Sequence, residues 1–273
     1  MTRARRATIL SYAILILAGF LSLFPILWIM GISLKTQADA FAMPPKLIFV
    51  PIWDHYAKVW GDAAFIKGFF NSVFAALLGN LMAFVIGIPA AFALNQRRVP
   101  ARGAILAWLL LSYMLPEFLF VIPMYGLFQA TGLYDSVFGL ALVYQTFTLP
   151  FTIWMMRAFF ADVPFALYEA ARLEGAKSWQ ILLRVYLPMA APGIAATAIL
   201  NTIRIWNELA IALGLTFDKA QTVTLAVAAY RGYASIDWGA LSAAAITSML
   251  PMLIFAVLAQ RQIVGGLSLG AVK

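Results

Sequence analysis

The most regular set of polar side chains in this sequence lies within its fifth long apolar stretch. Thr197, Asn201, Arg204 and Glu208 follow one another at steps of four, three and four residues, and Asn207 stands beside them. On a helix that spacing places the four on one face. Amide and carboxylate groups suit sugar hydroxyls, and the guanidinium fork suits a carboxylate, sulfonate or phosphate. The stripe therefore predicts contacts with a polar solute.

Arg204 is the basic residue of this stripe, and we expect it to have the highest free-energy cost of burial in the membrane. If its helix begins near Pro192, a rise of about 1.5 Å per residue places it about 18 Å into the membrane. A charge at that depth is expensive unless it is paired or functional. Three interpretations stay open: Arg204 lines a substrate pathway, pairs with Glu208 four residues later, or pairs with a residue of a partner chain.

A second charge in an apolar stretch is Glu117, which directly follows Pro116. Proline removes a helical hydrogen bond, so a kink is expected here, together with a free carbonyl at Ser112. Glu117 either lines a cavity or is the local partner of an Arg or Tyr. Tyr113 could stack on a sugar ring, and Tyr144, Gln145 and Thr148 are weaker candidates of the same kind. Aromatic residues make up 14% of the chain, so most of them must be packing.

The composition excludes most classes of protein. The chain has 273 residues, of which 64% are hydrophobic and 11% charged, and its mean hydropathy is +0.91. A soluble domain has about 45–50% apolar and about 25% charged residues. The sequence has no cysteine and one histidine, so thiol chemistry and a multi-histidine metal site are excluded. We expect no catalytic residue, no metal site and an all-α membrane protein.

Six stretches are long and apolar enough to cross a bilayer core, which takes about 20 residues. We expect a single transmembrane domain over residues 1–273 with these spans: about 8–32, 69–95, 103–127, 136–160, 192–214 and 239–263.

The basic residues predict the orientation of these spans. Twelve would lie on one side of the membrane and six on the other, with Arg204 inside a span. Because Lys and Arg collect on the cytoplasmic side, both termini are expected in the cytoplasm. This asymmetry also explains the net charge of +8 without nucleic acid. The larger group is Arg3, Arg5, Arg6, Arg97, Arg98, Arg102, Arg157, Arg172, Lys177, Arg184, Arg261 and Lys273.

Residues 161–191, which we call the elbow, are too polar to span and should lie on the cytoplasmic face. Asp162 is a good N-cap and Pro164 suits a first helical turn. Gly175 is a helix stop. Ser178 can cap a second short helix, which Pro188 should end. The pattern predicts a helix–glycine–helix hairpin.

The surface of this hairpin could receive another protein. Ala170 and Ala171 form a strip of small residues that permits close approach, and charged Glu169, Arg172 and Glu174 surround it. The alternatives are a hairpin that rests on lipid headgroups and a plain linker.

Several motifs resemble one family. Glu169-Ala170-Ala171, Gly175 and Leu187-Pro188 resemble the EAA coupling loop of ATP-binding-cassette (ABC) importer permeases, with Glu174 where aspartate is more usual. Asn71-Ser72, Trp206-Asn207-Glu208 and the ending Gly266-Leu267-Ser268-Leu269-Gly270-Ala271-Val272-Lys273 resemble the maltose-type carbohydrate permeases, specifically the six-span partner of the pair. The resemblance covers essentially the whole chain.

The resemblance implies a type I importer fold and a set of partners: a homologous second permease in a heterodimer, two ABC ATPase subunits that hold ATP and Mg, and a periplasmic solute-binding protein. It implies that the elbow residues above contact the ATPase, and that Lys273 adds a second contact. Maltose-type permeases usually carry an apolar residue where Arg204 stands, which hints at an acidic or sulfonated sugar. No Gly-x-x-x-x-Gly-Lys-Ser/Thr phosphate loop occurs here, so this chain has no such site for ATP.

The sequence thus predicts the permease subunit of an importer that carries a sugar, polyol or sugar derivative across the bacterial inner membrane by alternating access. A stand-alone secondary transporter, a permease for a non-sugar solute and an intramembrane enzyme remain as alternatives. A secondary transporter typically has internal repeats of comparable spans, and none is evident in this sequence.

Overall fold

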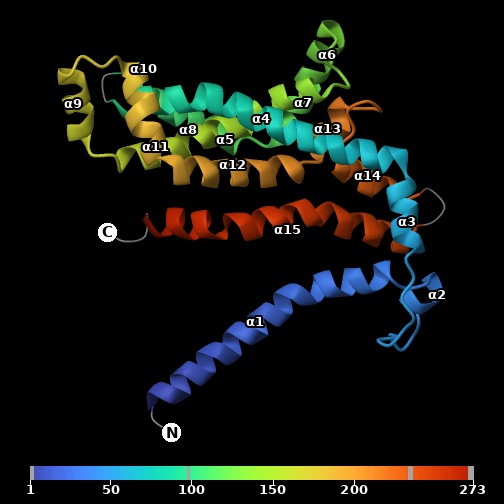
Figure 1. The fold of residues 1–273 in the computed structure, drawn as a ribbon. Helices are drawn as coiled ribbons and strands as arrows, with labels where there is room; N and C mark the ends of the chain where they lie inside the picture. Colours follow the sequence, from blue (N-terminus) through green and yellow to red (C-terminus); the bar gives the residue numbers. More distant parts are fainter. Residues whose placement is uncertain (1–2, 97–98, 233–235, 270–273) are drawn as a thin grey trace. The chain divides into compact units, whose positions relative to one another are not determined.

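The computed structural model describes residues 3–96, 99–232 and 236–269, and the regular elements in these ranges are helices (Figure 1). Apart from them there is an isolated antiparallel bridge between Arg231 and Ile236. The chain forms two compact units, one of Met1–Ile66 with Ala226–Leu250 and the other of Lys67–Leu225 with Pro251–Lys273. Each unit is described by itself.

The first unit holds α1 (Arg3–Ser33), α2 (Gln37–Ala40) and α3 (Asp54–Gly61). Side-chain bonds connect α3 to its surroundings: the hydroxyls of Ser33 and Tyr56 are 2.8 Å apart, and Lys58 forms an ion pair with Asp237 at 2.7 Å. Most large apolar side chains of α1 between Leu10 and Leu27 are exposed. A helix that is apolar on all sides and exposed is typical of a membrane segment.

The second unit contains most of the remaining helices. Its elements are most of α4 (Ala63–Asn95), α5 (Arg102–Met114), η1 (Glu117–Phe120), α6 (Val121–Thr131), α7 (Val137–Val143), α8 (Gln145–Ala161), α9 (Phe165–Leu173), α10 (Ser178–Ile181), η2 (Leu182–Tyr186), α11 (Leu187–Met189), α12 (Ala191–Trp206) and α13 (Ala210–Leu215). Helix α8 packs against α5 and α12, and α13 packs against α6 and η1. In Figure 1, α9 and α10 lie at one end of this unit and α6 at the other. Helices α14 (Val223–Ala229) and α15 (Trp238–Leu269) extend across the boundary of the two units.

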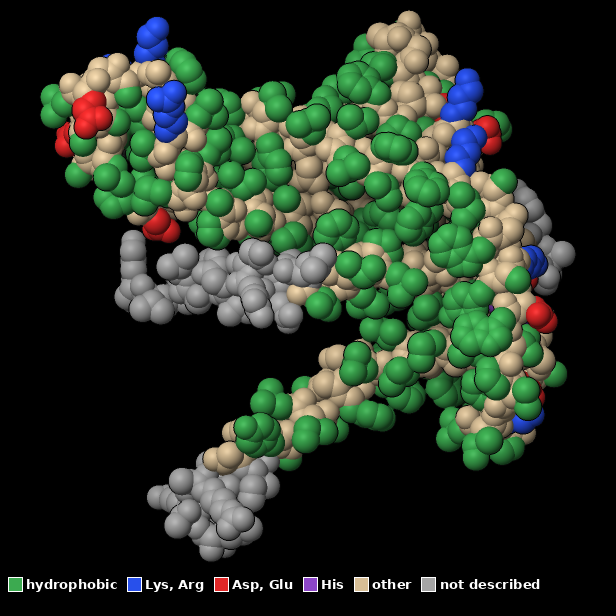
Figure 2. Space-filling view, in the orientation of Figure 1, with side chains coloured by type: hydrophobic (Ala, Val, Ile, Leu, Met, Phe, Trp, Pro, Cys, Tyr) green, Lys and Arg blue, Asp and Glu red, His purple; other side chains and the backbone are tan. Residues whose placement is uncertain are grey.

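Membrane-spanning capacity comes from continuous helices and from broken ones. Among the described residues, Leu10–Ser33, Ala63–Asn95 and Trp238–Val257 are long and apolar enough to span, and three bent helix pairs bring the number to six if each pair is one span. On the face drawn in Figure 2, charged side chains of the second unit gather at its two ends, with hydrophobic ones between them. An all-helical membrane protein is confirmed.

The expected kink at Pro116 is a full break, with α5 and the helix after it at 96°. Leu115 is extended, with ψ 136°, because the proline ring disfavours a helical residue before it. The expectation of a free carbonyl at Ser112 is wrong, since the N–H of Leu115 donates to it at 3.4 Å.

The expectation of one continuous helix over 192–214 is also wrong, because α12 ends at Trp206 and α13 begins at Ala210. The side chain of Asn207 donates to the carbonyl of Ile203, and that of Glu208 accepts backbone N–H groups of α13. Side chains that bond nearby backbone groups compete with helix continuation. Glu208 therefore does not share a helical face with Arg204.

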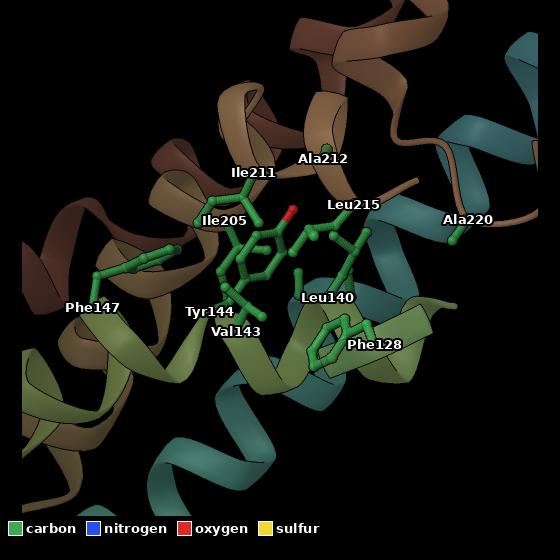
Figure 3. Close-up of a cluster of buried hydrophobic side chains, with 12 residues drawn as sticks. Phe128, Leu140, Val143, Tyr144, Phe147, Ile205, Ile211, Ala212, Leu215 and Ala220 are labelled. Carbon is green, nitrogen blue, oxygen red and sulfur yellow. The ribbon is translucent and has the colours of Figure 1, made fainter. Parts of the chain in front are cut away.

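Two buried apolar clusters hold the second unit together. One surrounds Tyr144 and Phe147 and includes side chains of α6, α7 and α13 (Figure 3). The other joins the elbow to α4 and α8 through aromatic rings: Tyr186 meets Phe92 edge-on at 4.9 Å and Phe160 at 5.5 Å. Because these rings are buried against one another, the elbow is fixed to the spanning helices at this point.

The loop after α13 is fixed by side chains from elsewhere in the second unit. Asp135 accepts four backbone N–H groups, from Phe217, Asp218, Lys219 and Ala220, at 2.9–3.2 Å. The side chain of Asn71 donates to two carbonyls of the same loop, and Ser72 accepts from Val223. The Asn71-Ser72 motif is thus an anchor for residues 219–223.

Asp135 makes this loop sensitive to acid. Partial burial by itself would raise the pKa of its carboxyl, but the four N–H bonds outweigh that and lower the pKa from 3.8 to about 2. The bonds therefore add stability that is complete above pH 3.8 and is lost as the pH falls toward 2. Asp135→Ala should remove it at every pH. We expect the amides of residues 217–220 to exchange hydrogen at least about tenfold faster in the variant, while the amides of α8 stay unchanged.

Candidate functional site

Arg204 and Glu117 form an ion pair in the second unit. Both Nε and Nη2 of Arg204 donate to Oε1 of Glu117, at 3.0 and 2.5 Å, and the two side chains are 32% and 28% exposed. Glu117 begins η1, directly after the break at Pro116, and the ion pair joins this residue to the last turn of α12. The hypothesis that Arg204 pairs with Glu208 is therefore wrong.

Two aromatic rings hold the guanidinium in place. Its carbon lies 4.7 Å from the ring centre of Tyr113 and 4.5 Å from that of Phe147. Tyr113 is itself stacked on Phe151 at 6.2 Å. Contacts of a cation with ring faces are favourable and strengthen where water is excluded. The structure thus brings together three predicted residues, Arg204, Glu117 and Tyr113.

Glu208 has a different set of partners and is 5% exposed. Its carboxylate accepts the backbone N–H groups of Ile211 and Ala212, at 2.6 and 3.1 Å, and the hydroxyl of Tyr144 at 3.2 Å. Figure 3 shows the Tyr144 hydroxyl directed toward the segment that carries these two residues. The carboxylate of Glu208 therefore caps the first turn of α13 from the position before its N-cap residue, Leu209.

The remaining candidate residues of the substrate pathway lie apart from the Arg204–Glu117 pair. Asn201 is buried and donates to the hydroxyl of Thr152 at 2.9 Å, which connects α12 to α8. Gln145 donates to the carbonyl of Gly79 on α4 at 3.1 Å. Asn207 is exposed. None of these three residues bonds to Arg204 or Glu117 among the described contacts.

In the elbow, Gly175 is confirmed as the helix stop. Its φ of +83° is a left-handed conformation that only glycine adopts without strain, and the N–H of Ala176 closes the end of α9 onto the carbonyl of Ala171. The expected cap at Asp162 is wrong, because that residue follows the last turn of α8 and α9 begins after Pro164.

The second half of the elbow also differs from the expectation. Ser178 is the first residue of α10 rather than its cap, and the side chain of Gln180 accepts the N–H of Lys177 instead. Pro188 does not end the helix, which continues to Met189 and bends at Ala190. The turn before it is a π-helix. A wider turn of this kind accommodates a residue without an N–H.

The elbow presents a mixed apolar and charged surface. Glu169, Ala170, Arg172 and Glu174 are exposed, and Ala171 is half-buried. Leu173 is 89% exposed and Trp179 56%. Leu187 is half-buried and Pro188 exposed. A cavity of about 430 Å³ lies between α9 and α10. Exposed apolar residues next to a cavity, rimmed by charge, are typical of a protein interaction surface. Lys273 lies outside the described residues.

Two residues that matter in this unit were not evident from the sequence, Phe147 and Asp135, whereas Tyr144 was expected as a weaker candidate and lies beside Glu208. Phe147 did not stand out because aromatic residues are frequent throughout the chain. Asp135 precedes Ser136, the N-cap of α7, and its sequence neighbours do not reveal that it bonds a loop more than 80 positions away.

Comparison with known proteins covers nearly the whole chain. Residues 83–268 match the family described as "Binding-protein-dependent transport system inner membrane component". The chain is 36% identical to the trehalose transport system permease protein SugB of Mycobacterium tuberculosis, over 99% of both chains. It is 34% identical to the diacetylchitobiose uptake system permease protein NgcG of Streptomyces coelicolor, over 98% of this chain and 90% of that one.

A solved structure shares the fold. It is a bacterial ABC transporter involved in the import of the acidic polysaccharide alginate, with a TM-score of 0.76, 23% sequence identity and coverage of 96% of this chain and 98% of that one.

Proposed function

Because the chain belongs to the family of binding-protein-dependent ABC transporter permeases, we propose that it imports a sugar or sugar derivative in partnership with a homologous second permease. The relatives named for trehalose and for diacetylchitobiose support a disaccharide-sized glycan. As a permease the chain is the non-catalytic, multi-pass subunit of the inner membrane, and ATP is bound by a partner. We take residues 1–273 as one transmembrane domain.

The Arg204–Glu117 pair supports a neutral glycan rather than an anionic one. The expectation of an acidic or sulfonated sugar came from Arg204 at a position that is usually apolar in maltose-type permeases, and Glu117 neutralises that charge. Among the described residues, the bonds of the pair occupy Nε, Nη2 and Oε1. Nη1 remains as a donor and Oε2 as an acceptor, which is the combination that two neighbouring sugar hydroxyls require. Tyr113 lies beside them and holds the guanidinium in place.

The elbow would transmit the ATPase cycle to this site. We propose that both termini and the elbow are cytoplasmic, that two ATPase subunits dock on the permease pair, and that a periplasmic binding protein delivers the sugar. ATP binding would close the ATPases and move the elbow, and the spanning helices would alternate between inward-facing and outward-facing states. The exposed surface around Glu169, Leu173 and Trp179 supports docking, because it is apolar and charged at once.

The left-handed conformation of Gly175, between α9 and α10, is the observation that supports the coupling role. It can be tested with a matched pair of glycine variants. Gly175→Ala places a side chain in open space, so its effect is backbone strain of about 1 kcal/mol. Gly132→Ala, at the end of α6, creates the same strain with φ +71° and also meets no atom. We expect sugar-stimulated ATP hydrolysis to fall at least about fivefold in Gly175→Ala and to change less than about twofold in Gly132→Ala.

Recovery of the ATPase subunit with the purified permease is the second measurement for the same pair of variants. A loss that is confined to Gly175→Ala supports docking at the elbow. Equal behaviour of the two variants would contradict it, and a chain that transports sugar alone in liposomes without ATP would overturn the importer as a whole.

A further inference from the structure

A cavity at the base of the elbow carries an unusual set of buried donors. It has a volume of about 650 Å³ and lies where α4 and α8 end and α5 begins. Three nitrogens on its lining residues are buried without a hydrogen-bond partner: Nε2 of Gln96, Nε of Arg102 and Nε of Arg157. The other buried, unpartnered side-chain atoms of the described residues are oxygens. Every unpartnered nitrogen donor of that set therefore belongs to this one cavity.

Buried donors without partners are rare in folded proteins and need an explanation. Neither guanidinium is ion-paired with a carboxylate of the described chain. Arg157 lies over the ring of Trp154 at 5.3 Å, which orients its charged fork but satisfies none of its N–H groups. Asp162 also lines the cavity and is exposed at its edge. The described side chains give the cavity two positive charges and one negative.

We propose that this cavity binds a phosphate group, held between Arg102 and Arg157 with Gln96 as a third donor. The planar fork of arginine matches phosphate oxygens and forms two bonds at once. Asp162 and the carbonyl ends of α4 and α8 oppose an anion, so the site requires both guanidinium groups together. The chemistry fits either the phosphodiester of an anionic phospholipid or inorganic phosphate.

The cavity lies where a bound ligand would contact both the elbow and the spanning helices. Its lining joins the ends of two spanning helices to Asp162, Pro164 and Phe165 at the start of the elbow. Basic pockets between transmembrane helices on the cytoplasmic side are suited to anionic headgroups. A phosphate bound here would connect the elbow to α4, α5 and α8, whichever solute the importer carries.

The test uses the complete importer, purified in detergent with its partner subunits. Phosphatidylglycerol, phosphatidylcholine and sodium phosphate are the three probes, and native mass spectrometry and the midpoint of thermal unfolding are the readouts. The variants are Arg102→Gln, Arg157→Gln and, as a charge-matched control, Arg184→Gln, which changes an exposed arginine of the elbow that does not line this cavity. We expect the first two to weaken binding at least about tenfold and the control less than about twofold.

Asp162→Asn gives a second test, which stays informative even if the arginine variants do not fold. The residue is exposed, so the variant should fold, and removal of the opposing charge should strengthen binding by about threefold to tenfold. Binding of phosphatidylglycerol alone identifies the lipid, and binding of sodium phosphate without lipid identifies the free ion. The proposal is overturned if wild type binds no probe, or if wild type, Arg157→Gln and Asp162→Asn bind equally.

Discussion

Replacing Arg204 with Met while Glu117 is kept should abolish sugar uptake and lower the yield of assembled importer. The variant leaves a carboxylate in a membrane segment without its cation. Breaking a fully buried pair costs about 3–5 kcal/mol and an exposed one about 1 kcal/mol or less. With side chains 32% and 28% exposed, this pair should lie between those limits, at about 2 kcal/mol. Glu117→Gln alone should have a similar effect, because it leaves the guanidinium without its carboxylate.

The double variant Arg204→Met with Glu117→Gln separates structure from transport. No charge remains unpaired, so assembly should recover to near the wild-type level. If the pair also binds sugar hydroxyls, uptake should stay at least about tenfold below wild type, because the guanidinium donor is gone and the carboxylate acceptor has become a neutral amide. Assembly is measured by recovery of the complete complex, and uptake in proteoliposomes loaded with ATP.

An exposed ion pair of the same unit provides the control. Lys67 and Asp218 are 3.2 Å apart and largely in solvent, with side chains 44% and 75% exposed. Lys67→Met should therefore change neither assembly nor uptake by more than about twofold. A double variant at Arg204 and Glu117 that transports at the wild-type rate would show that the pair is only structural. The proposed contact of Nη1 and Oε2 with two sugar hydroxyls would then be wrong.

These outcomes depend on a contact that the sequence did not reveal. Arg204 and Glu117 are 87 positions apart, and their pairing joins the residue directly after the break at Pro116 to the last turn of α12. Periodicity predicts which residues share a helical face only while the helix is continuous. For that reason the stripe through Thr197, Asn201 and Arg204 stands on one helix, whereas Glu208 does not.

Local rules predicted one feature of the elbow, its glycine stop, and failed for its caps. Gly175 could be placed because its left-handed conformation is a property of a single residue type at a helix end. The caps at Asp162 and Ser178 could not, since which of several polar residues begins a helix is decided by packing: Phe92, Phe160 and Tyr186 fix the elbow against α4 and α8. Apolar length predicted that these segments are membrane helices but not where they break.

The cap at Glu208 should give the largest loss of stability. Glu208→Ala leaves two backbone N–H groups of α13 and the Tyr144 hydroxyl without an acceptor in a buried place. Each orphaned donor costs about 1–3 kcal/mol, so the free energy of unfolding should fall by at least about 3 kcal/mol. Glu208→Gln keeps one carbonyl oxygen and should lose about half as much. Tyr144→Phe removes only one hydroxyl and should lose about 1 kcal/mol.

The test is the order of the three losses in the free energy of unfolding. They are measured by unfolding the purified complex in increasing concentrations of a denaturing detergent. Asp218→Ala is the matched control, because it removes a carboxylate whose side chain is 75% exposed and should change stability by less than about 0.5 kcal/mol. If Glu208→Ala is as stable as the control and yet fails to import sugar, the capping role is wrong. Glu208 would then belong to the substrate pathway. The bonds from Ile211, Ala212 and Tyr144 would hold its carboxylate in position to bind the sugar.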